Sequence, residues 1–237
     1  MNDTRIPWKP IGFNGLRFAV PSVWDIVEID ERMIGDYLLR FDEEGDMRLL
    51  VRALRKPVRQ FNPAKPTGQA LASIGKSLPA AYRKDFHPEA IRNIRVGSSN
   101  AAIDAVMVEW KAQELGGHIL TFRDAERETT YMFAFQWKPG ETRDANLAAL
   151  TEIGTSVALG PESNGEIRWR FGGISFTTDP DWQIEHIGIG AARTTFQFRH
   201  RLRRSDQLHT ARWGMANLLQ SSLTLDPWPL RNFSRPK

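Results

Sequence analysis

The sequence contains no cysteine among its 237 residues. This absence excludes disulfide bonds, thiolate metal sites, iron–sulfur clusters and cysteine nucleophiles. The sequence also lacks any apolar run close to the roughly 20 residues that a membrane-spanning helix needs. The polar start Met1–Arg5 leads into no apolar segment. We therefore expect no secretory signal, no membrane association and a cytoplasmic location.

Motifs for catalysis and cofactor binding are missing too. The segment Ile74–Ser77 ends like a phosphate-binding loop, but Ala70 stands where such a loop needs glycine. No pair of histidines has the spacing of a metal-binding motif; His186, His200 and His209 lie near enough in sequence to converge, yet ordinary polar histidines are the favoured interpretation. We predict no catalytic residue, no metal and no cofactor, although an active site assembled from scattered residues would leave no motif.

An internal repeat is the most informative feature that is present. A segment near the N-terminus recurs after 158 positions without a gap. The aligned pairs are Phe13 with Phe171, Gly15 with Gly173, Leu16 with Ile174, Phe18 with Phe176, Trp24 with Trp182, Ile26 with Ile184 and Ile29 with Ile187. A repeat at this distance predicts two copies of one unit that pack against each other. We assign repeat packing to Phe18, Trp24, Phe176 and Trp182.

Hydrophobic periodicity predicts the elements of the first copy. Alternating patterns indicate strands near residues 16–20 and 24–29, a hairpin over 37–54 and four strands between 91 and 137. Helical spacing predicts helices over 68–83 and from Thr142 to about Leu159. We expect an α+β fold, an antiparallel sheet with helices packed on it: a complete sandwich unit at 1–159, a linker at 160–166, and a partial second copy with a basic aromatic tail at 167–237.

The pattern Phe18-x-x-Pro21-x-x-Trp24 and the expected order of elements resemble the PsbP-like superfold. That group includes extrinsic photosystem subunits, a Ran-binding nuclear import factor and uncharacterised bacterial domains. The resemblance covers residues 11–159 and recurs in 171–187. It implies an α/β sandwich that binds other proteins and is seldom an enzyme, and it implies no catalytic residues.

Positive charge is concentrated at the C-terminal end. The last 58 residues hold 9 Lys and Arg against 4 Asp and Glu, whereas the rest of the chain holds 23 against 24. Arginine interleaved with aromatic residues suits both protein recognition and nucleic-acid binding. The candidate partner-binding residues are Arg201, Arg203, Arg204, Arg212, Trp213, Trp228, Arg231 and Phe233. A competing interpretation is that Trp228 and Phe233 cover an open sheet edge of the second copy.

Three functions are consistent with these observations. The leading hypothesis is a non-enzymatic accessory or assembly factor that binds a protein partner or another copy of itself. The first alternative is a nucleic-acid or polyanion binder that uses the Arg-rich C-terminal unit. The second is an enzyme or small-ligand carrier with a pocket between the two units, in which Trp24 and Trp182 would report the ligand by fluorescence.

Overall fold

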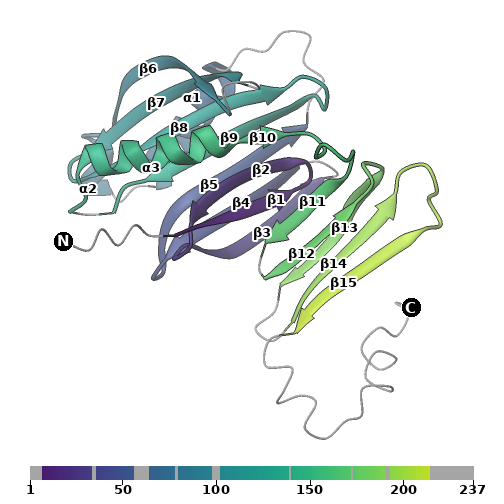
Figure 1. Cartoon of the computed structure of the whole chain (residues 1–237). Coiled ribbons are helices and arrows are strands. Elements are labelled where there is room, and N and C mark those ends of the chain that lie inside the picture. The colour runs from purple at the N-terminus through teal and green to yellow at the C-terminus, as the bar shows by residue number, and fades with distance from the viewer. Residues whose placement is uncertain are drawn as a thin grey trace, which may run out of the picture.

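The computed structural model describes residues 7–33, 36–55, 64–77, 80–97, 102–138, 140–171, 173–189 and 193–213. These residues form fifteen strands and three helices (Figure 1). All strand pairs are antiparallel, and they build three sheets of seven, five and three strands. None of the helices within this part of the chain is both long and apolar enough to cross a membrane.

The seven-stranded sheet holds the meander that the sequence predicts. Its strands, in spatial order, are β3 (Asp25–Met33), β4 (Asp36–Glu43), β5 (Asp46–Arg55), β9 (Thr129–Gln136), β8 (Leu115–Asp124), β7 (Ile103–Ala112) and β6 (His87–Val96). Helix α1 (Ala64–Ser77) packs on one face of this sheet, near β8 and β9, and the short helix α2 (Ala80–Arg83) follows it. Helix α3 (Arg143–Ser156) contacts β2 and β6. The side chain of Thr142 caps α3 by accepting a hydrogen bond from the amide of Ala145 at 3.3 Å.

The other two sheets contain the remaining strands. The five-stranded sheet has the order β10 (Ala158–Leu159), β2 (Leu16–Pro21), β1 (Trp8–Phe13), β11 (Ile167–Phe171) and β12 (Ile174–Thr178). The three-stranded sheet has the order β13 (Trp182–Ile189), β14 (Arg193–His200) and β15 (Gln207–Trp213). Strand β13 lies beside β3, so the three-stranded sheet continues the layer of the seven-stranded sheet (Figure 1).

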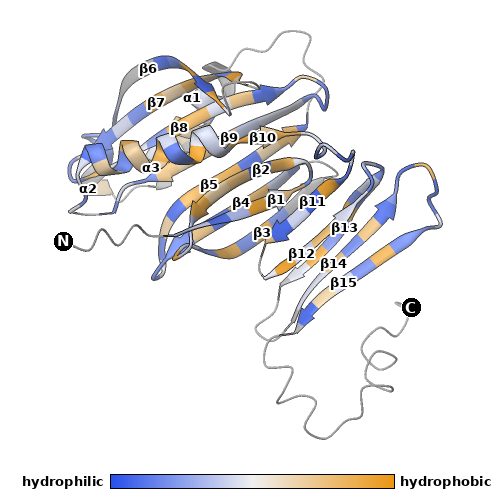
Figure 2. Cartoon of the chain, viewed as in Figure 1, coloured by the Kyte–Doolittle hydropathy of each residue, from blue (hydrophilic) through white to orange (hydrophobic). Residues whose placement is uncertain are grey.

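One apolar core lies between the five-stranded sheet and this layer. Its members come from all three sheets, and large side chains such as Phe41, Phe133, Trp169 and Phe198 have no solvent exposure. Apolar and polar residues alternate along β14 and β15 (Figure 2), which places one face of each strand on the core. A second, smaller cluster lies under α1.

The predicted α+β fold class is wrong, because the chain is mostly β. The two long helices are present, but every described element after residue 157 is a strand. The sequence pattern missed the scale of the β-structure for a physical reason. Strands between residues 8 and 21 pair with strands between residues 158 and 178 in a sheet of their own, and such long-range pairing leaves no local periodic signal.

The hairpins of the two repeat copies have the same register. Phe13 pairs with Leu16 in the first copy, and the residues 158 positions later, Phe171 and Ile174, pair in the second. The strands that follow, β3 and β13, each continue into a three-stranded antiparallel arrangement. Each carries a β-bulge at the equivalent place: one bulge lies between Ile26 and Glu28, and the other between Ile184 and His186. A bulge is a specific feature of a strand, so these matches support duplication, which stays a prediction.

Equivalent residues of the two copies meet at the centre of the five-stranded sheet. Gly12 of β1 pairs with Arg170 of β11, which lies 158 positions later. The rings of Phe13 and Phe171, again an equivalent pair, have centroids 5.1 Å apart. An antiparallel pair in which one residue faces its own counterpart has a local two-fold axis at that residue. Strand β11 therefore packs directly on β1, while the assignment of the two segments as copies of one unit stays a prediction.

The predicted linker at residues 160–166 is held by both copies. The Glu162 carboxylate accepts two hydrogen bonds from Arg168, at 2.6 and 2.7 Å, and one from Arg17 at 3.3 Å. The amide of Gly160 donates to the carbonyl of Gly15 at 2.9 Å. Strand β1 of the first copy pairs with strand β11 of the second, and side chains from both copies form one apolar core. The domain boundary itself stays a prediction.

Candidate functional site

Most of the arginines proposed for partner binding lie in or beside the loop between β14 and β15. The side chain of Arg201 forms an ion pair with Asp181 at 2.9 Å, and that of Arg203 forms one with Asp206 at 3.4 Å. Arg204 is exposed, and its side chain has no hydrogen bond or ion pair with another described residue. Arg212 lies in β15 and is also exposed. Part of the positive charge in this loop is therefore neutralised locally.

The aromatic candidates are largely beyond the described chain. Trp213 is the last residue of β15, while Trp228, Arg231 and Phe233 lie outside the described residues. Their roles in binding, or in covering a sheet edge, stay predictions. So does the nucleic-acid alternative, which depends on the same arginines.

The four repeat-packing residues occupy two different environments. Phe18 is buried against the rings of Phe41 and Phe133, with centroid distances of 5.8 and 5.1 Å. Trp24 is buried against Phe135, and the guanidinium of Arg48 lies 5.4 Å from its ring centroid.

The counterparts of these residues in the second copy are less buried. Phe176 is half-buried and stacks on Trp169 at 6.3 Å. Trp182 is half-buried, donates from Nε1 to Asp179 at 3.1 Å and meets His200 edge-on. The positions equivalent to Phe18 and Trp24 are therefore more exposed to solvent in the second copy.

The two copies differ most at the outer edge of β15. In the first copy, β5 pairs on one side with β4 and on the other with β9, through seven residue pairs from Leu49–Phe135 to Arg55–Thr129. In the second copy, β15 pairs with β14, and no described strand lies on its other side. Leu208 stands opposite Phe198 as Leu49 stands opposite Phe41, so β15 is the counterpart of β5.

The side chains of β15, which has a described strand on one side only, are less buried than those of β5. Leu49, Val51 and Ala53 of β5 have no solvent exposure. The residues at alternate positions along β15 are Leu208 and Thr210, which are half-buried, and Arg212, which is exposed. The outer edge of β12 also has no described neighbouring strand. Its counterpart in the first copy is the outer edge of β2, which pairs only with the two-residue strand β10. The β15 edge is thus the longer open site.

Two clefts lie at opposite ends of the β1–β11 pair. Cleft 1, of about 160 Å³, is formed where the first hairpin turn meets the starts of β11 and β13, and its lining includes Asn14, Ile167, Trp182 and Arg201. Cleft 2, of about 670 Å³, is formed where the second hairpin turn meets the starts of β1 and β3, and its lining includes Lys9, Ile26, Ile174 and Arg212. Trp182 lines cleft 1, whereas Trp24 is buried in the core, and the ligand hypothesis stays a prediction.

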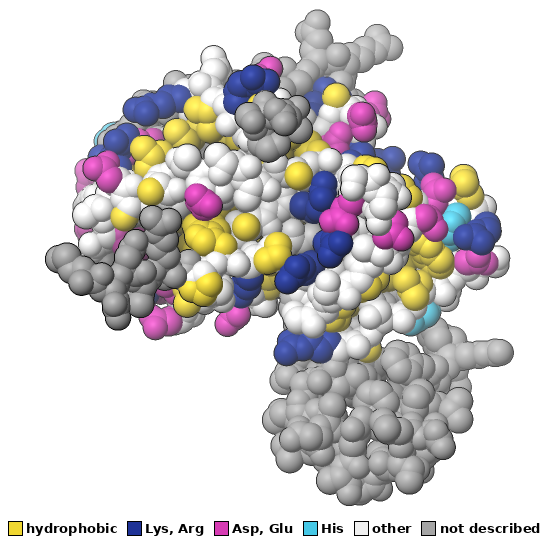
Figure 3. Space-filling model, in the orientation of Figure 1, with side chains coloured by type: hydrophobic (Ala, Val, Ile, Leu, Met, Phe, Trp, Pro, Cys, Tyr) yellow, Lys and Arg dark blue, Asp and Glu magenta, His cyan; other side chains and the backbone are white. Residues whose placement is uncertain are grey.

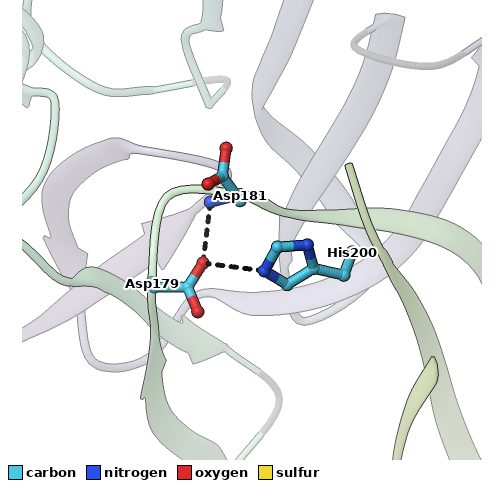
Figure 4. Close-up of side chains that lie close together, drawn as sticks. All are labelled: Asp179, Asp181 and His200. Atoms are coloured by element: carbon cyan, nitrogen blue, oxygen red, sulfur yellow. Dashed lines mark hydrogen bonds and ion pairs between the residues drawn. The ribbon is translucent and has the colours of Figure 1, made fainter. Parts of the chain in front are cut away.

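Asp179, Asp181 and His200 have potential ligand atoms within 4.8 Å of one another (Figure 4). This is the one group in the described ranges whose side chains could hold a metal ion, and of the three histidines named above it includes only His200. His200 is buried, and its Nε2 lies 3.8 Å from Oδ1 of Asp179. The same Asp179 oxygen accepts a hydrogen bond from the amide of Asp181 at 2.9 Å.

The hydrogen bonds of His200 do not fit a metal ligand. Its Nδ1 accepts from the amides of Leu202 and Arg203, at 3.2 and 3.1 Å. An accepting Nδ1 carries no proton, so the proton of the neutral imidazole is on Nε2, the atom that faces Asp179. Metal-binding histidines instead donate a hydrogen bond from the nitrogen that does not bind the metal. We interpret the group as a support for the turn between β14 and β15.

A buried polar cluster lies beneath the start of α3. Glu109 of β7 accepts two hydrogen bonds from Arg143, at 2.7 and 2.6 Å, and is 3% exposed. Arg143 lowers the pKa of Glu109 through these bonds. His118 of β8 is completely buried; its Nδ1 accepts from the indole nitrogen of Trp137 at 3.2 Å, and its Nε2 lies 3.8 Å from Glu109. Burial lowers the pKa of His118 from 6.5 to about 4.

The His118 environment predicts a loss of stability in mild acid. The unfolded chain takes up the proton near pH 6.5, whereas the folded protein takes it up near pH 4, so stability falls as the pH falls between these values. One proton corresponds to about 1.4 kcal/mol per pH unit. His118→Gln should flatten this part of the profile of unfolding free energy against pH, measured by urea denaturation. The exposed His87→Gln should leave the slope unchanged. An equal slope in His118→Gln and the unmodified protein would contradict the assignment.

Comparison with known proteins finds weak similarity in fold to solved structures. No family model matches the chain, and no curated protein matches it in sequence. The fold is similar to the solution structure of cyanobacterial PsbP (CyanoP) from Synechocystis sp. PCC 6803, with 12% identity and a TM-score of 0.46, over 67% of this chain and 96% of that chain. The weak PsbP-like resemblance stated from the sequence is confirmed. It concerns the fold alone.

Proposed function

We propose that this chain is a non-enzymatic binding protein that takes up an extended segment of a partner protein along the outer edge of β15. The observation that carries the proposal is the difference between two equivalent strands. β5 has a strand on each side, while β15 has a described strand on one side only. An open edge presents a row of unpaired backbone groups, and adding a strand is a common mode of peptide recognition.

The first copy supplies a template for the bound segment. β9 lies antiparallel on β5 and places Phe135, Phe133 and Tyr131 beside Leu49, Val51 and Ala53. A partner strand in the same place on β15 would put alternate side chains next to Leu208, Thr210 and Arg212. We therefore expect an apolar residue beside Leu208, where it would cover the half-buried core face.

Charge indicates an acidic partner. Residues 167–213 hold eight arginines against four Asp and Glu. Arg204, in the loop before β15, and Arg212, near the end of β15, are both exposed. Acidic residues at both ends of the bound segment would pair with them, which favours both the correct register and rapid association. We propose a segment with an apolar, β-branched or aromatic centre and acidic ends.

The composition of the edge also favours binding. β6, the last strand of the seven-stranded sheet, carries Pro88, Arg92 and Arg95, residue types that discourage further pairing. Among the seven residues of β15, Arg212 is the only Asp, Glu, Lys or Arg, and there is no proline. The β15 edge is less protected by its own sequence than the β6 edge is.

Site-specific photo-crosslinking tests the proposal. A benzoylphenylalanine at position 209, where the native His209 is exposed on β15, should crosslink one partner in a nuclease-treated native lysate. The same group at position 92, on the exposed face of the β6 edge, is the matched control and should not. The crosslinked segment, made as a synthetic peptide, should bind the purified protein and slow amide exchange in β15.

The contradicting results are equally specific. Equal crosslinking from positions 209 and 92 would show non-specific contact. A crosslinked peptide that binds without protecting any β15 amide would show that the partner uses another surface.

A further inference from the structure

Cleft 2 shares Arg212 with β15 but is otherwise formed by β1, β3, β11 and β12, and it combines an apolar wall with a cationic rim. Ile11 and Phe171 form buried parts of the wall, and Ile26 and Ile174 are half-buried beside them. A volume of about 670 Å³ lies within the range of small-molecule sites. The lining combines residues of the β11–β12 turn with residues at the starts of β1 and β3.

The charged groups at the rim do not balance. Lys9 donates to Asp25 at 3.3 Å and to the carbonyl of Ser22 at 3.0 Å, so Lys9 and Asp25 offset each other. The side chain of Arg170 is exposed and has no hydrogen bond or ion pair with another described residue. Asp25 is the only Asp or Glu among the described residues that line this cleft.

A second guanidinium is held at the rim by backbone geometry. Gly173, in the β11–β12 turn, has a φ of +76°, and a Cβ placed there would lie 2.9 Å from Cζ of Arg212. Arg212 therefore packs directly against the turn that forms one side of the cleft. Lys and Arg side chains follow the junction between the two parts of the molecule on the face shown in Figure 3.

We propose that cleft 2 binds a small amphiphilic anion, with an apolar body against Ile26 and Ile174 and a carboxylate head paired with Arg170. A guanidinium presents a planar pair of donors that matches a carboxylate. The apolar wall excludes inorganic anions as the preferred ligand, because they would gain nothing from it. The cationic rim likewise disfavours a neutral hydrocarbon of the same length.

Isothermal titration of the full-length protein tests this site with dodecanoate as the probe. Dodecanol supplies the same chain without charge, and inorganic phosphate supplies charge without the chain. We expect one-site binding of dodecanoate, at least tenfold weaker binding of dodecanol and no detectable binding of phosphate. A charged hydrogen bond corresponds to roughly a tenfold change in affinity or more.

Substitutions in the lining of cleft 2 test whether the ligand binds there. Arg170→Gln should weaken dodecanoate binding about tenfold, and Ile174→Ser should weaken it several-fold. Arg168→Gln, two residues away on the same strand and outside the cleft lining, is the matched control and should bind like the unmodified protein. Equal affinity for dodecanol and dodecanoate, or unchanged binding in Arg170→Gln, would overturn the proposal.

Discussion

Replacing Trp169 by alanine should lower the free energy of unfolding by about 3–5 kcal/mol and the melting temperature by roughly 10 °C. Trp169 of β11 has no solvent exposure and contacts the rings of Phe13, Phe176 and Phe198, at centroid distances of 5.6, 6.3 and 4.8 Å. Its indole nitrogen donates to Thr178 at 2.9 Å. The large effect is expected because this side chain joins both copies in one core. Urea and thermal unfolding measure it.

Two further variants serve as comparisons for Trp169→Ala. Trp169→Phe keeps an aromatic ring but loses the hydrogen bond, so a cost of about 1–2 kcal/mol is expected. Leu202→Ala, at a side chain that is 71% exposed in the same copy, should change stability by less than about 0.5 kcal/mol. If Trp169→Ala melts in two separate transitions, with the first copy unaffected, the common core is wrong.

Replacing Arg143 by methionine should cost about 2–3 kcal/mol at neutral pH. The change leaves Glu109, which is 3% exposed, as a buried carboxylate without its bidentate partner. The value is at the low end for a buried pair because the Arg143 side chain is 39% exposed. The deficit should shrink below the ordinary carboxyl pKa of 4.5, since a protonated Glu109 no longer needs the guanidinium.

The same strand offers a matched control for this prediction. Arg95 pairs with Asp104 of β7 at 3.6 Å, but both side chains are exposed, at 68% and 98%. Arg95→Met should therefore cost less than about 0.5 kcal/mol. Equal costs for Arg143→Met and Arg95→Met would show that burial does not determine the strength of these ion pairs.

Local sequence patterns predicted much of the secondary structure of the first copy. The hairpin expected over residues 37–54 is β4 and β5, and the four-strand meander is β6 to β9. The helix expected from Thr142 is α3, and the Thr142 side chain caps it. Asp104 and Glu109, five positions apart in β7, lie on opposite faces as strand alternation requires, with side-chain exposures of 98% and 4%. Each of these features depends on neighbours within a few residues, where periodicity and capping are informative.

Features that depend on distant residues were not predictable. The pairing of Gly12 with Arg170 and the resulting five-stranded sheet have no local signature, and they are the reason the fold class was wrong. His118 and Glu109 lie on adjacent strands opposite each other, so their contact follows only from the register. His200 meets Asp179 and Asp181, which close a turn, because β13 and β14 pair from Trp182 onward.

The most direct test of the central claim is amide hydrogen exchange, resolved by residue, in β5 and β15 of the purified full-length protein. Amides along β5 from Leu49 to Ala53 have a paired strand on each side and should all exchange slowly. In β15, alternate amides should exchange rapidly because they face the open edge, and only those bonded to β14 should be protected. Slow exchange at every amide of β15 in the protein alone would contradict the account, because the edge would already be occupied.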